Sequence, residues 1–160
     1  MPKLSYTSEK GLIEEPGGGV HINGNTFQGG TAKVFTHTAA SSNLTLTTSD
    51  SGAFITVSGN ASGVKILLPL ATAAPGFHCT IMLTANPANN LEVEETTATN
   101  NFITMNIVGS ANTDGLTGNQ TLRFARGTPN VAGDMAYIYS DGVNYIVESQ
   151  STNASAILAV

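Results

Sequence analysis

Apolar and polar residues alternate in many short stretches of this chain, and each stretch is bounded by glycine, proline, asparagine or serine. In residues 43–48 leucine alternates with threonine, and in residues 91–94 apolar residues alternate with glutamate. A period of two residues predicts β-strands with one buried face. The same reasoning predicts strands in residues 33–37, 53–58, 64–68, 77–84, 102–108 and 121–126. Only residues 70–76 have the composition for a single helical turn, and proline at position 69 is expected to end the strand before it.

The clearest local pattern is a hairpin in residues 135–149. Asp141-Gly142 separates two runs of β-branched and aromatic residues, 135–139 and 143–147, which predicts a two-residue type I′ turn. Both faces of the hairpin carry apolar residues, so we expect burial on at least one side.

About eight to ten short strands with no convincing helix predict an all-β fold. The architecture that we expect is an antiparallel β-sandwich or small barrel, jelly-roll-like, with an extended N-terminal arm. The predicted divisions are an arm in residues 1–31, a β-sandwich domain in residues 32–150 and a C-terminal tail in residues 151–160.

Residues 1–31 differ from the rest because they are rich in glycine and charge and poor in apolar residues. Such a segment cannot bury a core of its own, so it is either disordered or an arm that orders against another surface. The apolar residues that would anchor an arm to a capsid or a neighbouring subunit are Leu12, Ile13, Val20, Ile22 and Phe27.

Charge is scarce in the 160 residues: 11% are charged, and the formal net charge is −5 at pH 7. This composition argues against nucleic-acid binding, which needs clustered lysine and arginine. A polar but weakly charged surface is typical of extracellular or particle-bound β proteins. The first residues lack the apolar region of a secretory signal, and no apolar run reaches the ~20 residues of a membrane span.

Few residues carry the pattern of a reactive or metal-binding site. Cys79 lies in a strand-like run and is expected to be a small buried apolar residue. His21, His37 and His78 lack the spacing of a metal-binding pair, and neighbours such as His78 and Cys79 point to opposite faces of a strand. We therefore expect no metal and no cofactor.

Glu92, Glu94 and Glu95 form the densest acidic cluster. Glu92 and Glu94 share one face of the predicted strand, which is compatible with Ca²⁺ binding or with a glycosidase-like acid/base pair. The alternative is a solvated face of an edge strand, which blocks edge-to-edge aggregation. The chain contains no tryptophan to form a sugar platform, so the second interpretation is favoured and no enzyme is predicted.

Three segments resemble small all-β virion proteins of tailed bacteriophages. They are a Leu-Thr…Ser-Gly…Val opening at 46–57, a Leu-Pro-x-Ala segment ending in Gly-Phe at 68–77, and a Gly-Asp…Ser-Asp-Gly-x-Asn-Tyr-x-Val closing segment at 133–147. The resemblance covers roughly two-thirds of the chain and is greatest to capsid decoration, or cement, proteins.

This resemblance implies a non-enzymatic structural protein on the outer capsid surface of a virion. The implied partners are the major capsid protein and further copies of the chain, most simply as a homotrimer at local threefold positions. The alternative is a tail-fibre or adhesin tip that binds a host receptor or glycan. Its contact surface would be the polar residues 109–119 with Tyr137, Tyr139 and Tyr145.

Overall fold

In a computed structural model, the regular secondary structure of the described residues is almost entirely β-strand. The structure describes residues 4–7, 11–14, 20–22, 25–27, 33–38, 42–59, 62–97, 102–108, 111–113, 120–127, 131–153 and 155–160. In these ranges the helical elements are two 3₁₀ turns, η1 at Thr48–Asp50 and η2 at Ala71–Ala73. The all-β class is therefore confirmed. The chain divides into two compact units, Met1–Ala32 and Lys33–Val160.

The N-terminal unit contains two small hairpins. Strands β1 (Leu4–Thr7) and β2 (Gly11–Glu14) pair antiparallel, as do β3 (Val20–Ile22) and β4 (Asn25–Phe27). Each pair is a separate two-stranded sheet. The segment predicted as an extended arm thus contains local strand pairing. Its few short apolar stretches did not predict these hairpins.

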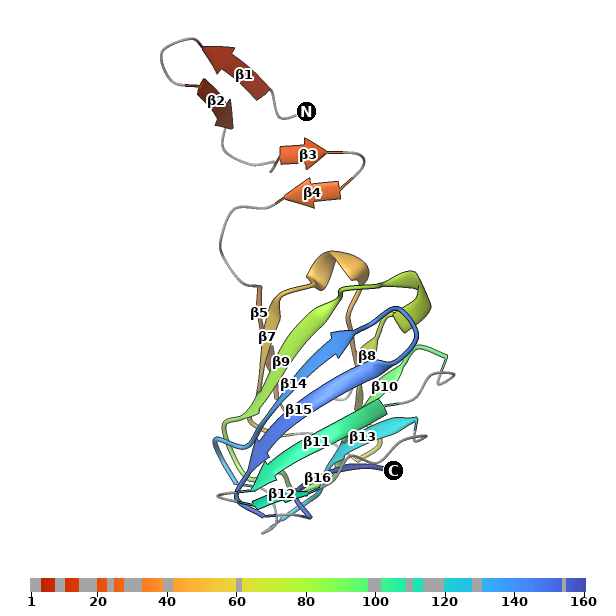
Figure 1. Cartoon of the computed structure of the whole chain (residues 1–160). Coiled ribbons are helices and arrows are strands. Elements are labelled where there is room, and N and C mark those ends of the chain that lie inside the picture. The colour runs from red at the N-terminus through yellow and green to blue at the C-terminus, as the bar shows by residue number, and fades with distance from the viewer. Residues whose placement is uncertain are drawn as a thin grey trace. The chain divides into compact units, whose positions relative to one another are not determined.

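The second unit contains a seven-stranded and a five-stranded sheet. The larger sheet has the order β12-β11-β15-β14-β9-β7-β5, and its central strands run side by side across the front of the unit in Figure 1. Its strands are β5 (Val34–His37), β7 (Ala53–Val57), β9 (His78–Leu83), β11 (Phe102–Val108), β12 (Ala111–Thr113), β14 (Met135–Ser140) and β15 (Tyr145–Ser151). The smaller sheet has the order β16-β13-β10-β8-β6. Its strands are β6 (Leu44–Thr45), β8 (Lys65–Leu68), β10 (Leu91–Glu95), β13 (Thr121–Phe124) and β16 (Ile157–Ala159).

The expectation of purely antiparallel sheets is wrong, because both sheets are mixed. The pairs β5·β7, β7·β9 and β11·β15 are parallel in the larger sheet, and β6·β8 and β8·β10 are parallel in the smaller one. From β5 to β10 the chain alternates between the two sheets. A chain that crosses to the other sheet and returns enters the first sheet again in the same direction, which makes neighbouring strands parallel. Alternation of apolar residues reports the buried face and not the strand direction.

The predicted hairpin is confirmed as β14–β15, but its two-residue turn is wrong. Ser140 pairs with Tyr145, so the connection spans four residues, and Val143 belongs to the turn. Asp141 Oδ1 accepts hydrogen bonds from the backbone N–H groups of Val143 at 2.7 Å and Asn144 at 2.6 Å. The aspartate thus closes the turn with its side chain, and Gly142 provides a positive φ of 93°.

One cluster of buried side chains joins the inner faces of both sheets. It includes Ile55 and Ile138 from the larger sheet and Ile66 and Phe124 from the smaller one. Tyr145 is fully buried in this cluster. Its ring stacks on Phe102 at a centroid distance of 5.6 Å, and its hydroxyl donates to the Pro69 carbonyl oxygen at 2.6 Å.

The C-terminal residues belong to the sheets of the second unit. Ser151 ends β15, and β16 pairs antiparallel with β13, so that Ala159 is opposite Leu122. Ala156, Ile157 and Ala159 are buried. The apolar end of the chain is therefore held by its own five-stranded sheet.

Candidate functional site

The acidic cluster of β10 lies in the interior of the five-stranded sheet. β10 is flanked by β13 and β8, so the interpretation as an edge strand is wrong. The sheet order could not be read from the alternation of residues 91–94. Glu92 and Glu94 share the partly exposed outer face, as predicted, whereas Glu95 is buried on the inner face.

Basic residues on the two neighbouring strands engage the outer carboxylates. Lys65 Nζ lies 2.7 Å from Glu94 Oε1 and 3.5 Å from Glu92 Oε2, and Arg123 Nη2 lies 3.0 Å from Glu92 Oε1. Thr121 Oγ1 donates to Glu94 Oε1 at 3.0 Å. The hydrogen bond to Glu94 raises the pKa of Lys65 above its ordinary value. This network ties three strands together, and its geometry is that of a structural ion-pair cluster.

Glu95 is separated from this network by the sheet itself. Its Oε1 accepts a hydrogen bond from the backbone N–H of Ala71 at 2.7 Å, at the start of η2. The three glutamates therefore do not converge on one point. Among the described residues no group of three or more His, Cys, Asp or Glu side chains is placed to hold a metal ion.

Cys79 and His78 lie on opposite sides of β9. Cys79 is buried, as predicted, and His78 is exposed. Burial raises the pKa of the Cys79 thiol to about 12, so the thiolate that a nucleophile requires is not formed near neutral pH. His37 is also buried, and its Nε2 has no hydrogen-bond partner among the residues that the structure describes.

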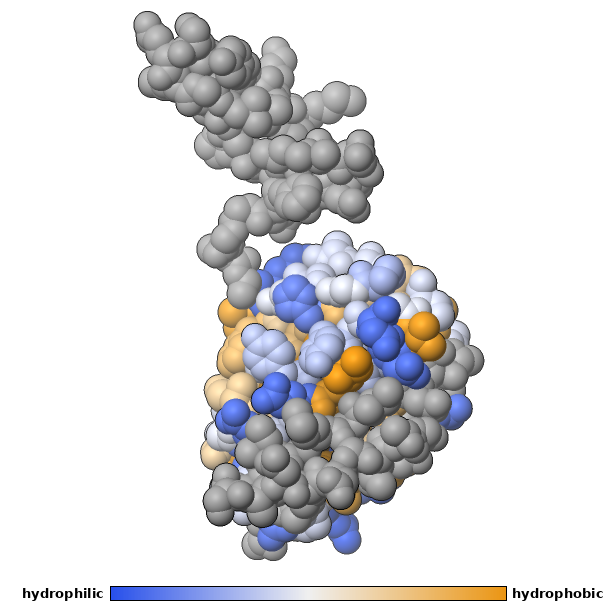
Figure 2. All heavy atoms as spheres, in the orientation of Figure 1, coloured by the Kyte–Doolittle hydropathy of each residue, from blue (hydrophilic) through white to orange (hydrophobic). Residues whose placement is uncertain are grey.

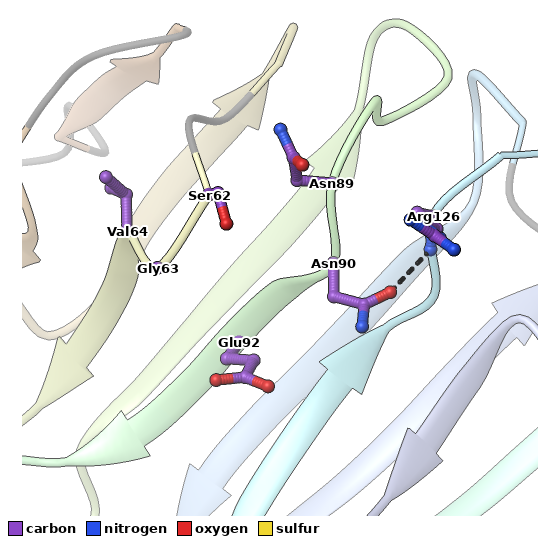
Figure 3. A pocket seen from close by; sticks show the side chains of 7 residues that line it. All are labelled: Ser62, Gly63, Val64, Asn89, Asn90, Glu92 and Arg126. Carbon is purple, nitrogen blue, oxygen red and sulfur yellow. Dashed lines mark hydrogen bonds between the residues drawn. The ribbon is translucent and has the colours of Figure 1, made fainter.

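A polar hollow lies at one end of the five-stranded sheet. β8 and β10 are parallel and β13 is antiparallel to β10, so the starts of β8 and β10 meet the end of β13 there. The hollow has a volume of about 270 Å³. Figure 3 shows its lining residues, which are Ser62, Gly63, Val64, Asn89, Asn90, Glu92 and Arg126.

Arg126 is held at the rim of this hollow by backbone hydrogen bonds. Its N–H donates to Asn90 Oδ1 at 2.9 Å, drawn as a dashed line in Figure 3, and the N–H of Gly127 donates to the Pro87 carbonyl at 2.9 Å. Gly127 has a φ of 77°, a conformation that favours glycine. Arg126 is the last residue of the strand predicted at 121–126, whereas β13 ends at Phe124. Its position beside Asn90 depends on the sheet order, so no pattern in the sequence singled it out.

The outer face of the seven-stranded sheet bears the tyrosines considered for ligand contact. Tyr137 and Tyr139 are 50% and 43% exposed, but Tyr145 is completely buried, so its assignment to a contact surface is wrong. Tyr145 lies on the other face of the sheet because it is opposite Ser140, which faces inward together with Ala136 and Ile138. Among the coloured residues of this face, Figure 2 shows hydrophobic residues as separate spots between hydrophilic ones.

The polar segment 109–119, predicted as a loop, lies mostly outside the described residues. Within it, Ala111–Thr113 form β12, which pairs antiparallel with β11. That part of the loop prediction is wrong, since the three residues add an edge strand to the seven-stranded sheet.

The five predicted anchor residues occupy strands of the two N-terminal hairpins. Leu12 and Ile13 lie in β2, where their backbone partners are Tyr6 and Ser5. Val20 and Phe27 are paired with each other across β3 and β4. The remaining anchor, Ile22, is paired with Asn25. Their contact with a capsid or neighbouring subunit stays a prediction.

Comparison with known proteins finds no match to a family model, to a curated protein or to a solved structure. No helix among the described residues is long and apolar enough to cross a membrane.

Proposed function

We propose that this chain is a non-enzymatic structural protein that decorates the outer surface of a tailed-phage capsid. The observation that carries the proposal is the N-terminal unit. Leu12, Ile13, Val20, Ile22 and Phe27 lie in hairpins whose strands have only three or four residues. An isolated two-stranded hairpin is marginally stable in water and requires packing against another surface. The major capsid protein is the surface that we propose.

The second unit supplies the body of the proposed decoration protein. Its two sheets share one hydrophobic cluster, which supports a two-layer β-sandwich as the architecture. We propose that three such units associate around a local threefold axis, with the N-terminal segment as an arm toward neighbouring capsomers. Weak contacts made by three linked arms give a large avidity, so no single arm contact has to be strong.

The first test is the copy number of the protein in purified particles, measured by quantitative mass spectrometry against the major capsid protein. Decoration predicts a simple lattice ratio between the two proteins. A few copies per particle would instead place the protein in the tail. Absence from particles would remove the capsid proposal altogether.

A second test addresses the arm directly in the full-length chain. Val20→Ser with Phe27→Ser removes the apolar pair of β3–β4, and we expect co-sedimentation with undecorated capsids to fall about tenfold or more. His21→Ser with Thr26→Ser changes the adjacent pair of the same hairpin and is the matched control. Thermal unfolding of the second unit should be the same in both variants. Equal capsid binding by both variants would contradict the role of the apolar residues.

A further inference from the structure

The polar hollow at the end of the five-stranded sheet carries an inference that is independent of capsid binding. Its side chains come from the residues before β8 and β10, from Glu92 within β10, and from Arg126, two residues after the end of β13. Both the N–H of Arg126 and that of Gly127 are hydrogen-bonded to the loop before β10. The hollow is thus built on a hydrogen-bonded frame, which reduces the entropy lost when a ligand binds.

Arg126 differs from the other basic residues that the structure describes. Lys33, Lys65 and Arg123 each form an ion pair with a carboxylate, whereas Arg126 forms none with the described residues. Its side chain is exposed at the rim of the hollow. A guanidinium presents a planar set of donors that matches a carboxylate in a bidentate geometry.

The charges around the hollow select the class of ligand. Arg126 and Glu92 are the charged residues of the lining, and Glu92 belongs to the ion-pair network with Lys65, Arg123 and Glu94, so these five side chains together leave one positive charge. This balance favours a ligand with a single negative charge over one dense in phosphate, whose charge it would not neutralise. A ligand with an ammonium group is disfavoured, because Lys65 and Arg123 already contact Glu92 and would repel a third cation there.

The remaining lining groups suit neutral hydroxyls. Ser62 offers a hydroxyl, Asn89 and Asn90 carry amides, and Glu92 has a carboxylate with several acceptor positions. A volume of about 270 Å³ lies just below the ~300 Å³ lower end of pockets for drug-sized ligands. The hollow therefore has room for one small polar ring.

From these observations we propose that the hollow binds a carboxylate-bearing sugar residue, such as a uronic acid unit of an acidic polysaccharide. The carboxylate contacts the Arg126 guanidinium, and the ring hydroxyls contact Ser62, Asn89 and Glu92. The site is distinct from the tyrosines of the seven-stranded sheet, since it lies on the other sheet.

The test is a titration of the ¹⁵N-labelled full-length chain with sodium glucuronate, followed by amide chemical shifts. Glucose lacks the carboxylate and acetate lacks the ring hydroxyls. These two probes therefore test the contribution of the hydroxyls and that of the carboxylate separately. We expect saturable shifts around Gly63, Asn90 and Arg126 with glucuronate, and about tenfold weaker binding of glucose and of acetate. Arg126→Gln should weaken glucuronate binding about tenfold, and Arg126→Lys should weaken it less because it keeps the charge.

Lys33→Gln is the matched control because it removes one positive charge outside the residues that line the hollow. It should leave glucuronate binding unchanged. Equal shifts with acetate would mean an adventitious carboxylate only, and retained binding in Arg126→Gln would place the ligand elsewhere. No saturable shift up to about 50 mM glucuronate would also overturn the proposal. If Arg126→Gln instead abolished capsid binding without sugar binding in the parent chain, Arg126 would contact a carboxylate of a protein partner.

Discussion

The outer faces of the two sheets carry different side chains although their inner faces are alike. On the five-stranded sheet, Lys65, Glu92, Glu94 and Arg123 form a connected ion-pair network across three strands. On the seven-stranded sheet, the outward positions of β14 are Met135, Tyr137 and Tyr139. Both sheets bury aliphatic and aromatic residues in the same cluster.

This difference indicates that the two sheets are stabilised in different ways. Cross-strand charge pairs favour the observed register of β8, β10 and β13, because a shift of one residue would separate them. β14 and β15 have no corresponding ion-pair network among the residues described. Their stability should therefore depend more on the inner face, where Tyr145 is the largest fully buried side chain.

The largest expected effect is that of Tyr145→Ala. This change removes the ring stacked on Phe102 and the hydrogen bond to Pro69, and it leaves a cavity. We expect the free energy of unfolding to fall by about 3–5 kcal/mol, measured by urea denaturation. Tyr137→Ala on the exposed side of the same hairpin is the matched control, with an expected loss below about 1 kcal/mol. Similar losses for both variants would show that the two faces of this sheet are not energetically different.

A smaller effect is expected from Lys65→Met, which leaves Glu92 and Glu94 close together without their shared cation. The free energy of unfolding should fall by about 1 kcal/mol at low salt, and the loss should shrink in 1 M NaCl because salt screens partly exposed charges. Lys33→Met removes an isolated pair with Asp50 and should cost less. A loss for Lys65→Met that does not change with salt would mean that packing of the lysine chain, and not charge, is responsible.

The smallest effect is a pH dependence from His37 at the inner side of β5. Burial lowers the pKa of His37, so below its ordinary pKa of about 6.5 the unfolded chain binds a proton more readily than the folded one. Stability should be fully present above about pH 6.5 and fall as the pH drops toward the folded-state pKa, by less than about 1.4 kcal/mol per pH unit. Urea denaturation between pH 7.5 and 5.5 measures this slope, and His37→Gln should flatten it. An unchanged slope in that variant would assign the dependence to another group.

Much of the local structure follows from alternation in the sequence. The strands at Ala53–Val57 and Leu91–Glu95 lie where a period of two residues predicts them. Burial of Cys79 with exposure of His78 follows from the same period. These features depend on neighbours in the chain, so the sequence is sufficient to predict them.

The candidate site required contacts between distant segments. Arg126 meets Asn90 because β13 and β10 are neighbours, and Ser62 joins them because β8 lies on the other side of β10. The alternation in each strand is compatible with several sheet orders. The glutamates of β10 were therefore recognisable in the sequence, but their ion pairs with Lys65 and Arg123 were not.

Alternation along the sequence was sufficient to predict that the chain is β-structure, where most strands lie and which residues face inward, because alternation is a local property of each strand. Tertiary structure decided the strand directions, the sheet order and the burial of Tyr145 against Pro69. It also placed Arg126 at a polar hollow. The physical reason is that these features depend on the repeated crossing of the chain between two sheets, which the residues of one strand do not encode.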